Sequence, residues 1–136
     1  IWTKKKDKWK FTKNRENIFH IKVNNSEEYF EALPRILRRI EIFKPNILLY
    51  YMGLDVLETD RMGGIPGFNV KKLDKRNNFV AKFLIKNKFP TIISLGGGYV
   101  NYQRSKREID KQWKKIEKLF LRSVKIIVKT SKPNNH

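Results

Sequence analysis

Apolar residues along this chain form short runs that alternate with longer stretches of helical spacing. Residues 17–23 alternate between apolar and polar positions, which predicts a strand with one more polar side. Residues 46–52 and 91–95 are almost continuously apolar and rich in strand-forming side chains. Such runs are typical of strands whose two faces are both buried, as in a parallel sheet.

Three stretches with helical spacing follow these predicted strands. The first has Ser26 as its N-cap, with glutamates in its early turns and arginines in its later ones, an order that suits the helix dipole. The second spans residues 74–88, and the third opens with a capping box formed by Ser105 and Glu108. The apolar residues expected to face inward are Phe30, Leu33, Leu37 and Ile40 in the first helix, Phe79, Val80, Phe83 and Leu84 in the second, and Ile109, Trp113, Ile116 and Phe120 in the third.

This order of strands and helices predicts an α/β domain with a mostly parallel sheet flanked by helices. The 136 residues suffice for one such domain. Four glycines and a proline between residues 53 and 73 predict a long loop there. We expect a basic and aromatic loop or linker at 1–16, the domain at 17–128 and a frayed tail at 129–136.

The formal net charge of +18 admits two interpretations. Clustered Lys and Arg supply affinity for nucleic acid, whereas an abundance of Lys, Asn and Ile also follows from biased base composition. The lysines are spread along the chain, so we favour the compositional interpretation and expect nucleic-acid binding to be weak and non-specific. The best candidate for any such contact is the segment 2–11, which is the densest in basic and aromatic residues.

Other features of the sequence limit the cellular settings that are expected for the protein. No apolar run approaches the length of about 20 residues that spans a bilayer, so we expect no membrane segment. Cysteine is absent, which excludes thiolate metal sites and favours an intracellular setting, either cytosolic or nuclear. The first residue is Ile1 rather than methionine, which is consistent with a piece of a longer protein.

Unusual residues follow two of the predicted strands. Asp55 comes shortly after the strand at 46–52, and three glycines and Tyr99 follow the strand at 91–95. In open parallel sheets ligands gather beyond the carboxyl ends of the strands, so Asp55 and Tyr99 would share one cleft if the strands are neighbours. Each residue also has a purely structural interpretation: Asp55 as a loop cap, the glycines as a turn and Tyr99 as a core aromatic.

Two motifs carry a resemblance to a known family. The segment YYMGLDVLETDRMGGIPGFNV, at 50–70, contains the pattern G-x-D-x-x-x-x-D-x-x-G, and PTIISLGGGY, at 90–99, ends in G-G-G-Y. Together they resemble the C-terminal half of the histone deacetylase family, with details closest to its class IV and bacterial or acetoin-utilisation-like branch. The resemblance extends over residues 17–99. It implies the C-terminal part of an arginase/deacetylase-like fold, in a hydrolase that acts on acyl-lysine proteins or small acyl-amides.

The resemblance also implies a role for each motif residue. Asp55 would be one of three protein ligands of a catalytic Zn²⁺, and Tyr99 would donate a hydrogen bond to the substrate carbonyl. Gly97 and Gly98 would line the path of the acyl-lysine chain. The other motif residues would have structural roles, and Asp60, the second acid of the motif, would fix the glycine-rich loop. These structural residues are Gly53, Asp60 and Gly63.

The chain departs from the family in its histidines. The family's D-x-H segment, which supplies the other zinc ligands, and its paired histidines, which supply the base, are both absent. The two histidines here are His20, expected on the polar side of a strand, and His136, in the expected frayed tail. We therefore expect the C-terminal fragment of a zinc-dependent deacetylase, inactive alone. The alternative is a non-catalytic basic module that binds nucleic acid or a partner protein.

Overall fold

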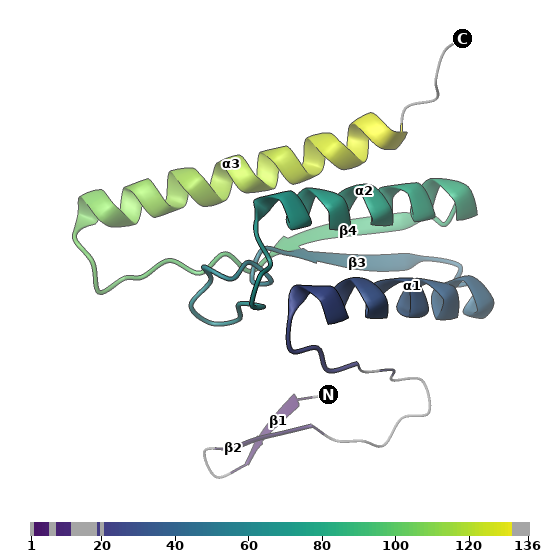
Figure 1. Ribbon diagram of the computed structural model, residues 1–136, viewed down its shortest axis with the longest axis horizontal. Helices are drawn as coiled ribbons and strands as arrows, with labels where there is room; N and C mark the ends of the chain where they lie inside the picture. The colour runs from purple at the N-terminus through teal and green to yellow at the C-terminus, as the bar shows by residue number, and fades with distance from the viewer. Residues whose placement is uncertain (1, 6–7, 12–18, 20, 132–136) are drawn as a thin grey trace.

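The fold combines a small parallel sheet with long helices (Figure 1). The computed structural model describes residues 2–5, 8–11, 19 and 21–131. Within these residues it confirms the predicted α/β class. The elements are β1 (Trp2–Lys5), β2 (Lys8–Phe11), α1 (Ser26–Phe43), β3 (Leu48–Gly53), α2 (Val70–Asn87), β4 (Thr91–Gly96) and α3 (Lys106–Ser131).

The N-terminal elements differ from the expectation from sequence. Strands β1 and β2 pair in antiparallel register, with Trp2 opposite Phe11, so a hairpin occupies much of the segment expected to be a loop or linker. No strand forms at 19 or 21–23, which are the described residues of the predicted strand at 17–23. The prediction is wrong there because β3 and β4 pair only with each other, and no sheet edge in the described chain takes up this segment. His20 lies outside the described residues.

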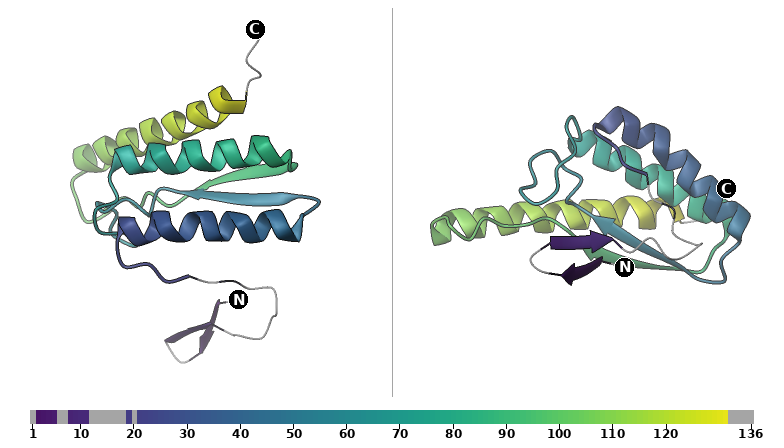
Figure 2. Two further views of the ribbon diagram at one scale, coloured as in Figure 1. Left: turned by 45° about the vertical axis from the view of Figure 1, so that its right-hand side comes forward. Right: turned by 90° about the horizontal axis from the view of Figure 1, so that it is seen from below.

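Helices cover one face of the sheet formed by β3 and β4 (Figure 2). Met52 of β3 is fully buried and packs with Ala81 of α2 and Ile127 of α3. Tyr50, two residues earlier on the same face, packs against the buried leucines of α1. Apolar residues from α1, α2 and α3 therefore form the core on this side of the sheet.

The opposite face of the sheet is uncovered in the described part of the chain. Leu49, Tyr51 and Ile92 are 74, 61 and 59% exposed. The prediction that both faces of these strands are buried is therefore wrong. An apolar run indicates that a strand is suited to burial on both faces, but the described elements leave this side open.

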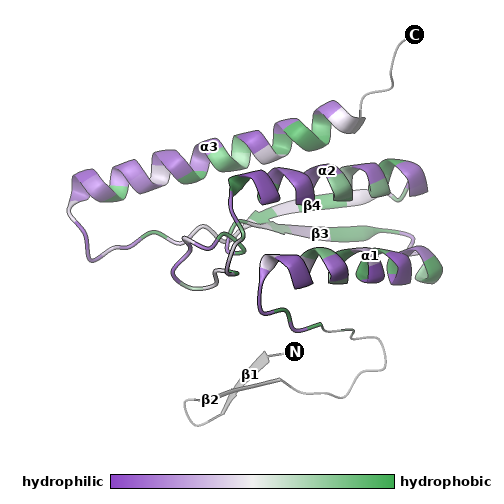
Figure 3. Cartoon of the chain, in the orientation of Figure 1, coloured by the Kyte–Doolittle hydropathy of each residue, from purple (hydrophilic) through white to green (hydrophobic). Residues whose placement is uncertain are grey.

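Each helix carries both apolar and polar residues (Figure 3), and most positions predicted to face inward are buried or half-buried. Leu33 and Leu37 on α1 are buried, and so is Val80 on α2. Phe79 and Trp113 were expected to face inward but are 41 and 47% exposed, because each lies at the margin of its apolar stripe. The buried residues of α3 are Leu119, Ser123 and Ile127.

Two helices begin at residues other than those predicted. The N-cap of α1 is Asn25 rather than Ser26, and its side-chain oxygen accepts a hydrogen bond from the Glu28 N–H at 2.9 Å. Helix α2 begins at Val70 rather than at residue 74, because Asn69 caps it and shortens the preceding loop. Asparagine is as good an N-cap as serine, so the pattern at 25–26 admits either position.

Helix α3 begins as predicted and runs beside α2 (Figure 1). The Glu108 N–H donates to the Ser105 hydroxyl at 3.4 Å, and the Ser105 N–H donates to the Glu108 carboxylate at 3.2 Å, which confirms the capping box. The helix continues to Ser131 and so includes the first residues of the expected frayed tail. Residues 132–136, with His136, lie outside the described part. None of the described helices combines the length and the apolar character needed to cross a membrane.

Candidate active site

The strand register brings the two candidate loops to one edge of the sheet. Strands β3 and β4 pair in parallel, with Gly53 opposite Gly96 at their carboxyl ends. Asp55 follows the first of these glycines and Tyr99 follows the second. The expectation that both residues leave the same sheet edge is therefore confirmed.

Asp55 lies in a close-fitting cradle of glycines. A Cβ atom placed on Gly53, Gly63 or Gly97 would come closer than 3.0 Å to an atom of Asp55. These glycines come from the end of β3, from the loop before α2 and from the loop after β4. Any larger residue at these positions would displace Asp55, which accounts for the spacing of glycines in both motifs.

Backbone hydrogen bonds fix the same turn. The Leu54 N–H donates to the Gly96 carbonyl at 2.8 Å, and the Gly64 N–H donates to the Asp55 carbonyl at 2.7 Å. The first bond extends the sheet by one residue, and the second closes the loop behind Asp55. Backbone hydrogen bonds therefore fix the main chain on both sides of Asp55.

Asp60 joins the two candidate loops. One oxygen of its carboxylate accepts hydrogen bonds from the N–H groups of Met62 and Gly63, at 2.9 and 3.0 Å. The other oxygen accepts a hydrogen bond from the Tyr99 N–H at 3.1 Å. A single carboxylate therefore connects the loop after β3 to the loop after β4.

Tyr99 borders a cavity of about 230 Å³ between these loops and α3. Tyr99 is 49% exposed, and the two preceding glycines have φ values of 69° and 75°, in the left-handed region. Asp60 also lines the cavity, but Asp55 is not among its lining residues. The expectation that Asp55 and Tyr99 open into one cleft therefore finds no support in this cavity.

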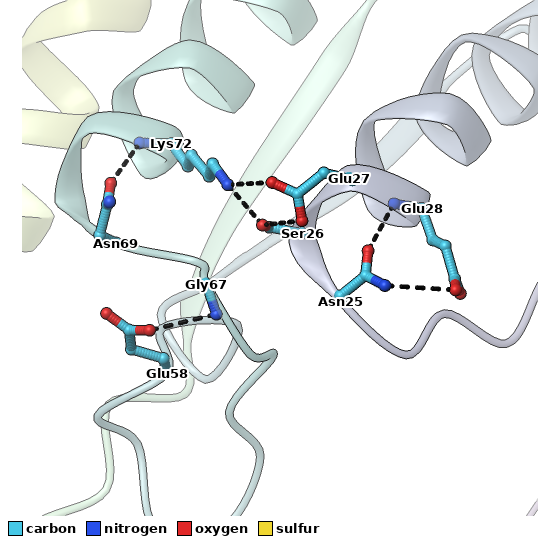
Figure 4. A network of polar contacts seen from close by, with 8 residues as sticks. All are labelled: Asn25, Ser26, Glu27, Glu28, Glu58, Gly67, Asn69 and Lys72. Carbon is cyan, nitrogen blue, oxygen red and sulfur yellow. Dashed lines mark hydrogen bonds and ion pairs between the residues drawn. The ribbon is translucent and has the colours of Figure 1, made fainter.

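Polar contacts join the starts of α1 and α2 and close the loop before α2 (Figure 4). The Gly67 N–H donates to the Glu58 carboxylate at 3.1 Å. The Lys72 ammonium at the start of α2 donates to the Ser26 hydroxyl at 2.5 Å and to the Glu27 carboxylate at 2.6 Å. The bond from Lys72, followed by that from Ser26, lowers the pKa of Glu27 to about 2. The bonds from Lys72 join α1 to α2, and the Ser26 N–H donates to the Pro66 carbonyl at 3.0 Å, which joins α1 to the loop.

An arginine that was not singled out from the sequence lies beneath Asp55. Arg76 is 3% exposed, and its Nη1 donates to the Gly53 carbonyl at 2.7 Å. It lies near Tyr29, whose pKa is raised, chiefly because the hydroxyl is buried. The Arg76 guanidinium opposes this rise, and the Asp55 carboxylate adds to it. The signal in the sequence is an arginine in the inward stripe of α2, between Leu73 and Val80.

A model of the histone deacetylase domain matches residues 3–116, which include Asp55, Asp60 and Tyr99. The chain belongs to the histone deacetylase family. The match begins inside the segment expected to be a loop or linker and ends within α3. No solved structure matches the chain.

The described part of this histone deacetylase chain does not form a complete zinc site by itself. It contains no group of three His, Cys, Asp or Glu side chains that could hold a metal ion. A structural or catalytic zinc needs at least three protein ligands. Asp55 is a single carboxylate and does not by itself meet this requirement.

Proposed function

We propose that this chain is the C-terminal part of a zinc-dependent deacetylase that hydrolyses N-acyl-lysine or a similar acyl-amide. The family match supports the hydrolase class. The observation that carries the proposal is the register of β3 and β4, which presents Asp55 and Tyr99 at one sheet edge. We assign the chain further to the class IV and bacterial or acetoin-utilisation-like branch, on the motifs at 50–70 and 90–99.

In this proposal Asp55 is one zinc ligand, and the remaining ligands come from polypeptide outside the described residues. Zinc held by Asp55 and those ligands would supply an activated water by lowering its pKa. The Tyr99 hydroxyl donates a hydrogen bond to the substrate carbonyl oxygen as negative charge develops on it. The resemblance places the acyl-lysine chain beside the backbone of Gly97 and Gly98, whose Cβ positions face Asp55 and Ile116.

The same reasoning assigns Asp60 a supporting role. Its hydrogen bond to the Tyr99 N–H fixes the backbone from which the hydroxyl group is presented. Its bonds to Met62 and Gly63 hold the glycine that packs against Asp55. Asp60, with Gly53 and Gly63, would therefore set the geometry of the site without touching the substrate.

A second candidate function is that of a basic module without catalysis. A broad groove of about 790 Å³ runs along α3 and is lined by several cations. Such a surface attracts polyanions at low salt. The cations that line it are Lys111, Lys114, Lys115, Lys118 and Arg122.

The test uses the protein at its full natural length. Wild type should bind one equivalent of zinc and hydrolyse an acetyl-lysine peptide, and Asp55→Asn should lose both, because a carboxamide is a poor zinc ligand. Asp110→Asn, at an exposed position on α3, is the matched control and should change neither. Zinc content unchanged by Asp55→Asn would overturn the proposal.

The coding sequence upstream of Ile1 offers a second check, since a deacetylase requires D-x-H and paired histidines there.

A further inference from the structure

A buried cation lies behind the turn that carries Asp55. The Arg76 side chain is on the inward face of α2, between Leu73, which is fully buried, and Val80, which is 3% exposed. Removing a guanidinium from water is costly, so buried arginines are retained where hydrogen bonds or opposite charges compensate. The groups that accept hydrogen bonds from Arg76 therefore indicate the role of this buried side chain.

The guanidinium donates its hydrogen bonds to neutral acceptors. Its Nη1 donates to the Gly53 carbonyl at 2.7 Å, while Nε and Nη2 both donate to the side-chain oxygen of Asn77, at 3.1 and 3.0 Å. Asn77 is itself fully buried. In the described part of the chain, no carboxylate forms an ion pair with Arg76. The guanidinium thus divides its hydrogen bonds between the Asn77 side chain and one backbone carbonyl, and it also lies near Tyr29.

That carbonyl belongs to the peptide unit that begins the turn to Asp55. The C=O of this unit comes from Gly53 and accepts from Arg76, and its N–H comes from Leu54 and donates to the Gly96 carbonyl at 2.8 Å. The peptide plane is rigid, so bonds at both its ends fix its orientation. A Cβ on Gly53 would overlap Asp55 Oδ1, so the Asp55 carboxylate lies against the residue that begins this peptide unit.

We propose that Arg76 is a positioning residue that fixes the Gly53–Leu54 peptide plane and so the direction of the Asp55 side chain. Asn77 orients the guanidinium by accepting from two of its nitrogens. Three nitrogens of the planar guanidinium reach Asn77 and Gly53 together, an arrangement that a lysine ammonium does not reproduce. The inference rests on the proposed function for the role of Asp55, but the geometry that it describes exists without metal.

The experiment measures amide hydrogen exchange at single-residue resolution on the metal-free protein of full natural length. In Arg76→Met we expect the Leu54 and Gly64 amides to exchange roughly tenfold faster, because one charge-assisted bond is lost from the turn. Arg76→Lys should give a smaller change of the same sign. Lys82→Met, at an exposed position on α2, is the control and should leave both amides unchanged.

The alternative is that Arg76 serves stability alone. In that case exchange would accelerate equally in the turn and at the amide of Lys88, which donates to the Leu84 carbonyl at the end of α2. Equal acceleration, or none at Leu54, would overturn the inference. If Arg76→Met does not fold, the same comparison in Arg76→Lys decides between the two roles.

A second measurement separates this inference from the proposed function. Zinc affinity of Arg76→Met should fall by roughly tenfold while its folded fraction is unchanged, and Lys82→Met should bind zinc as wild type does. If Asp55→Asn leaves zinc binding intact, the proposed function fails, and the exchange data still decide whether Arg76 positions the turn. If zinc binding depends on Asp55 but not on Arg76, the inference fails alone.

Discussion

The carboxylate of Asp60 accepts a hydrogen bond from the backbone N–H of Tyr99 at 3.1 Å, although the two residues are 39 positions apart in the chain. The same carboxylate accepts bonds from two N–H groups of its own loop. The loops after β3 and β4 are therefore connected by more than the sheet. A substitution of Asp60 should therefore alter the position of the Tyr99 backbone.

Asp60→Ala should lower turnover of the full-length deacetylase by roughly tenfold or more and should reduce the free energy of unfolding by about 1–3 kcal/mol. Three N–H groups lose their acceptor, and the Tyr99 backbone loses its link to the loop before α2. Steady-state kinetics and denaturant titration measure the two effects. Asp110→Ala is the control, and turnover equal to wild type in Asp60→Ala would show that the link does not position Tyr99.

Tyr99→Phe should lower turnover by roughly a hundredfold or more while zinc content stays unchanged. The change removes only a hydroxyl, so a loss of rate without a loss of metal assigns that hydroxyl to the transition state. Tyr102→Phe, at a tyrosine that is 70% exposed, is the matched control and should retain full turnover. Unchanged turnover in Tyr99→Phe would make Tyr99 a packing residue.

The elements that follow local rules could be predicted from the sequence. The capping box of Ser105 and Glu108 depends on residues in one turn, and the buried stripe of Leu33 and Leu37 depends on helical spacing. The open sheet face could not be predicted, because exposure of Leu49 depends on which elements cover it. A periodic pattern contains no information on that point.

The candidate site likewise has one part that could be predicted from the sequence and one part that could not. Asp55 and Tyr99 stand out because each follows an apolar run, and the parallel register that unites them is a general consequence of a strand–helix–strand unit. Arg76 could be placed on the inward face of α2 from its spacing. Its partner Gly53 is 23 residues away, and nothing in the local pattern indicates that contact.

Acid should weaken the fold through Glu27. Its pKa in the folded chain is lowered to about 2 from 4.5, chiefly by Lys72, so this pair stabilises the folded state fully above pH 4.5. The contribution is lost as the pH falls from 4.5 to 2. In Lys72→Met the free energy of unfolding should change less over this pH range than in wild type, and Lys71→Met should behave as wild type. Identical pH profiles for Lys72→Met and wild type would contradict this origin of the dependence.

Nucleic acid should bind weakly, without sequence preference and with steep salt dependence. If the basic surface is compositional, any pair of exposed lysines contributes equally. Replacing Lys114 and Lys118 on α3 should therefore weaken binding as much as replacing Lys71 and Lys82 on α2. Fluorescence anisotropy with random and defined duplexes at several salt concentrations measures this. Tight, sequence-selective binding that depends on α3 alone would favour the basic-module function.

The isolated chain of residues 1–136 should self-associate. Leu49 and Ile92 are paired across β3 and β4 and are 74 and 59% exposed, so they form the centre of an open apolar sheet face. Replacing both with threonine should reduce self-association, measured by sedimentation, at little cost in folding because these side chains are not packed. Leu37→Thr is the contrasting control: Leu37 is buried, so the change should lower the free energy of unfolding by about 2–4 kcal/mol. Equal sedimentation of the double variant and wild type would show that another surface drives association.

The same isolated chain should neither hold zinc tightly nor hydrolyse an acetyl-lysine reporter. Its described residues contain no group of three metal-ligating side chains, and one carboxylate cannot fix a tetrahedral ion. Without activated water and a base, the Tyr99 hydroxyl has no developing charge to stabilise. Dialysis against zinc followed by metal analysis, together with the reporter assay, tests both points on the threonine double variant, which should remain dispersed. One equivalent of tightly bound zinc, with turnover abolished by Asp55→Asn, would show that the chain supplies a complete site from residues not recognised as ligands.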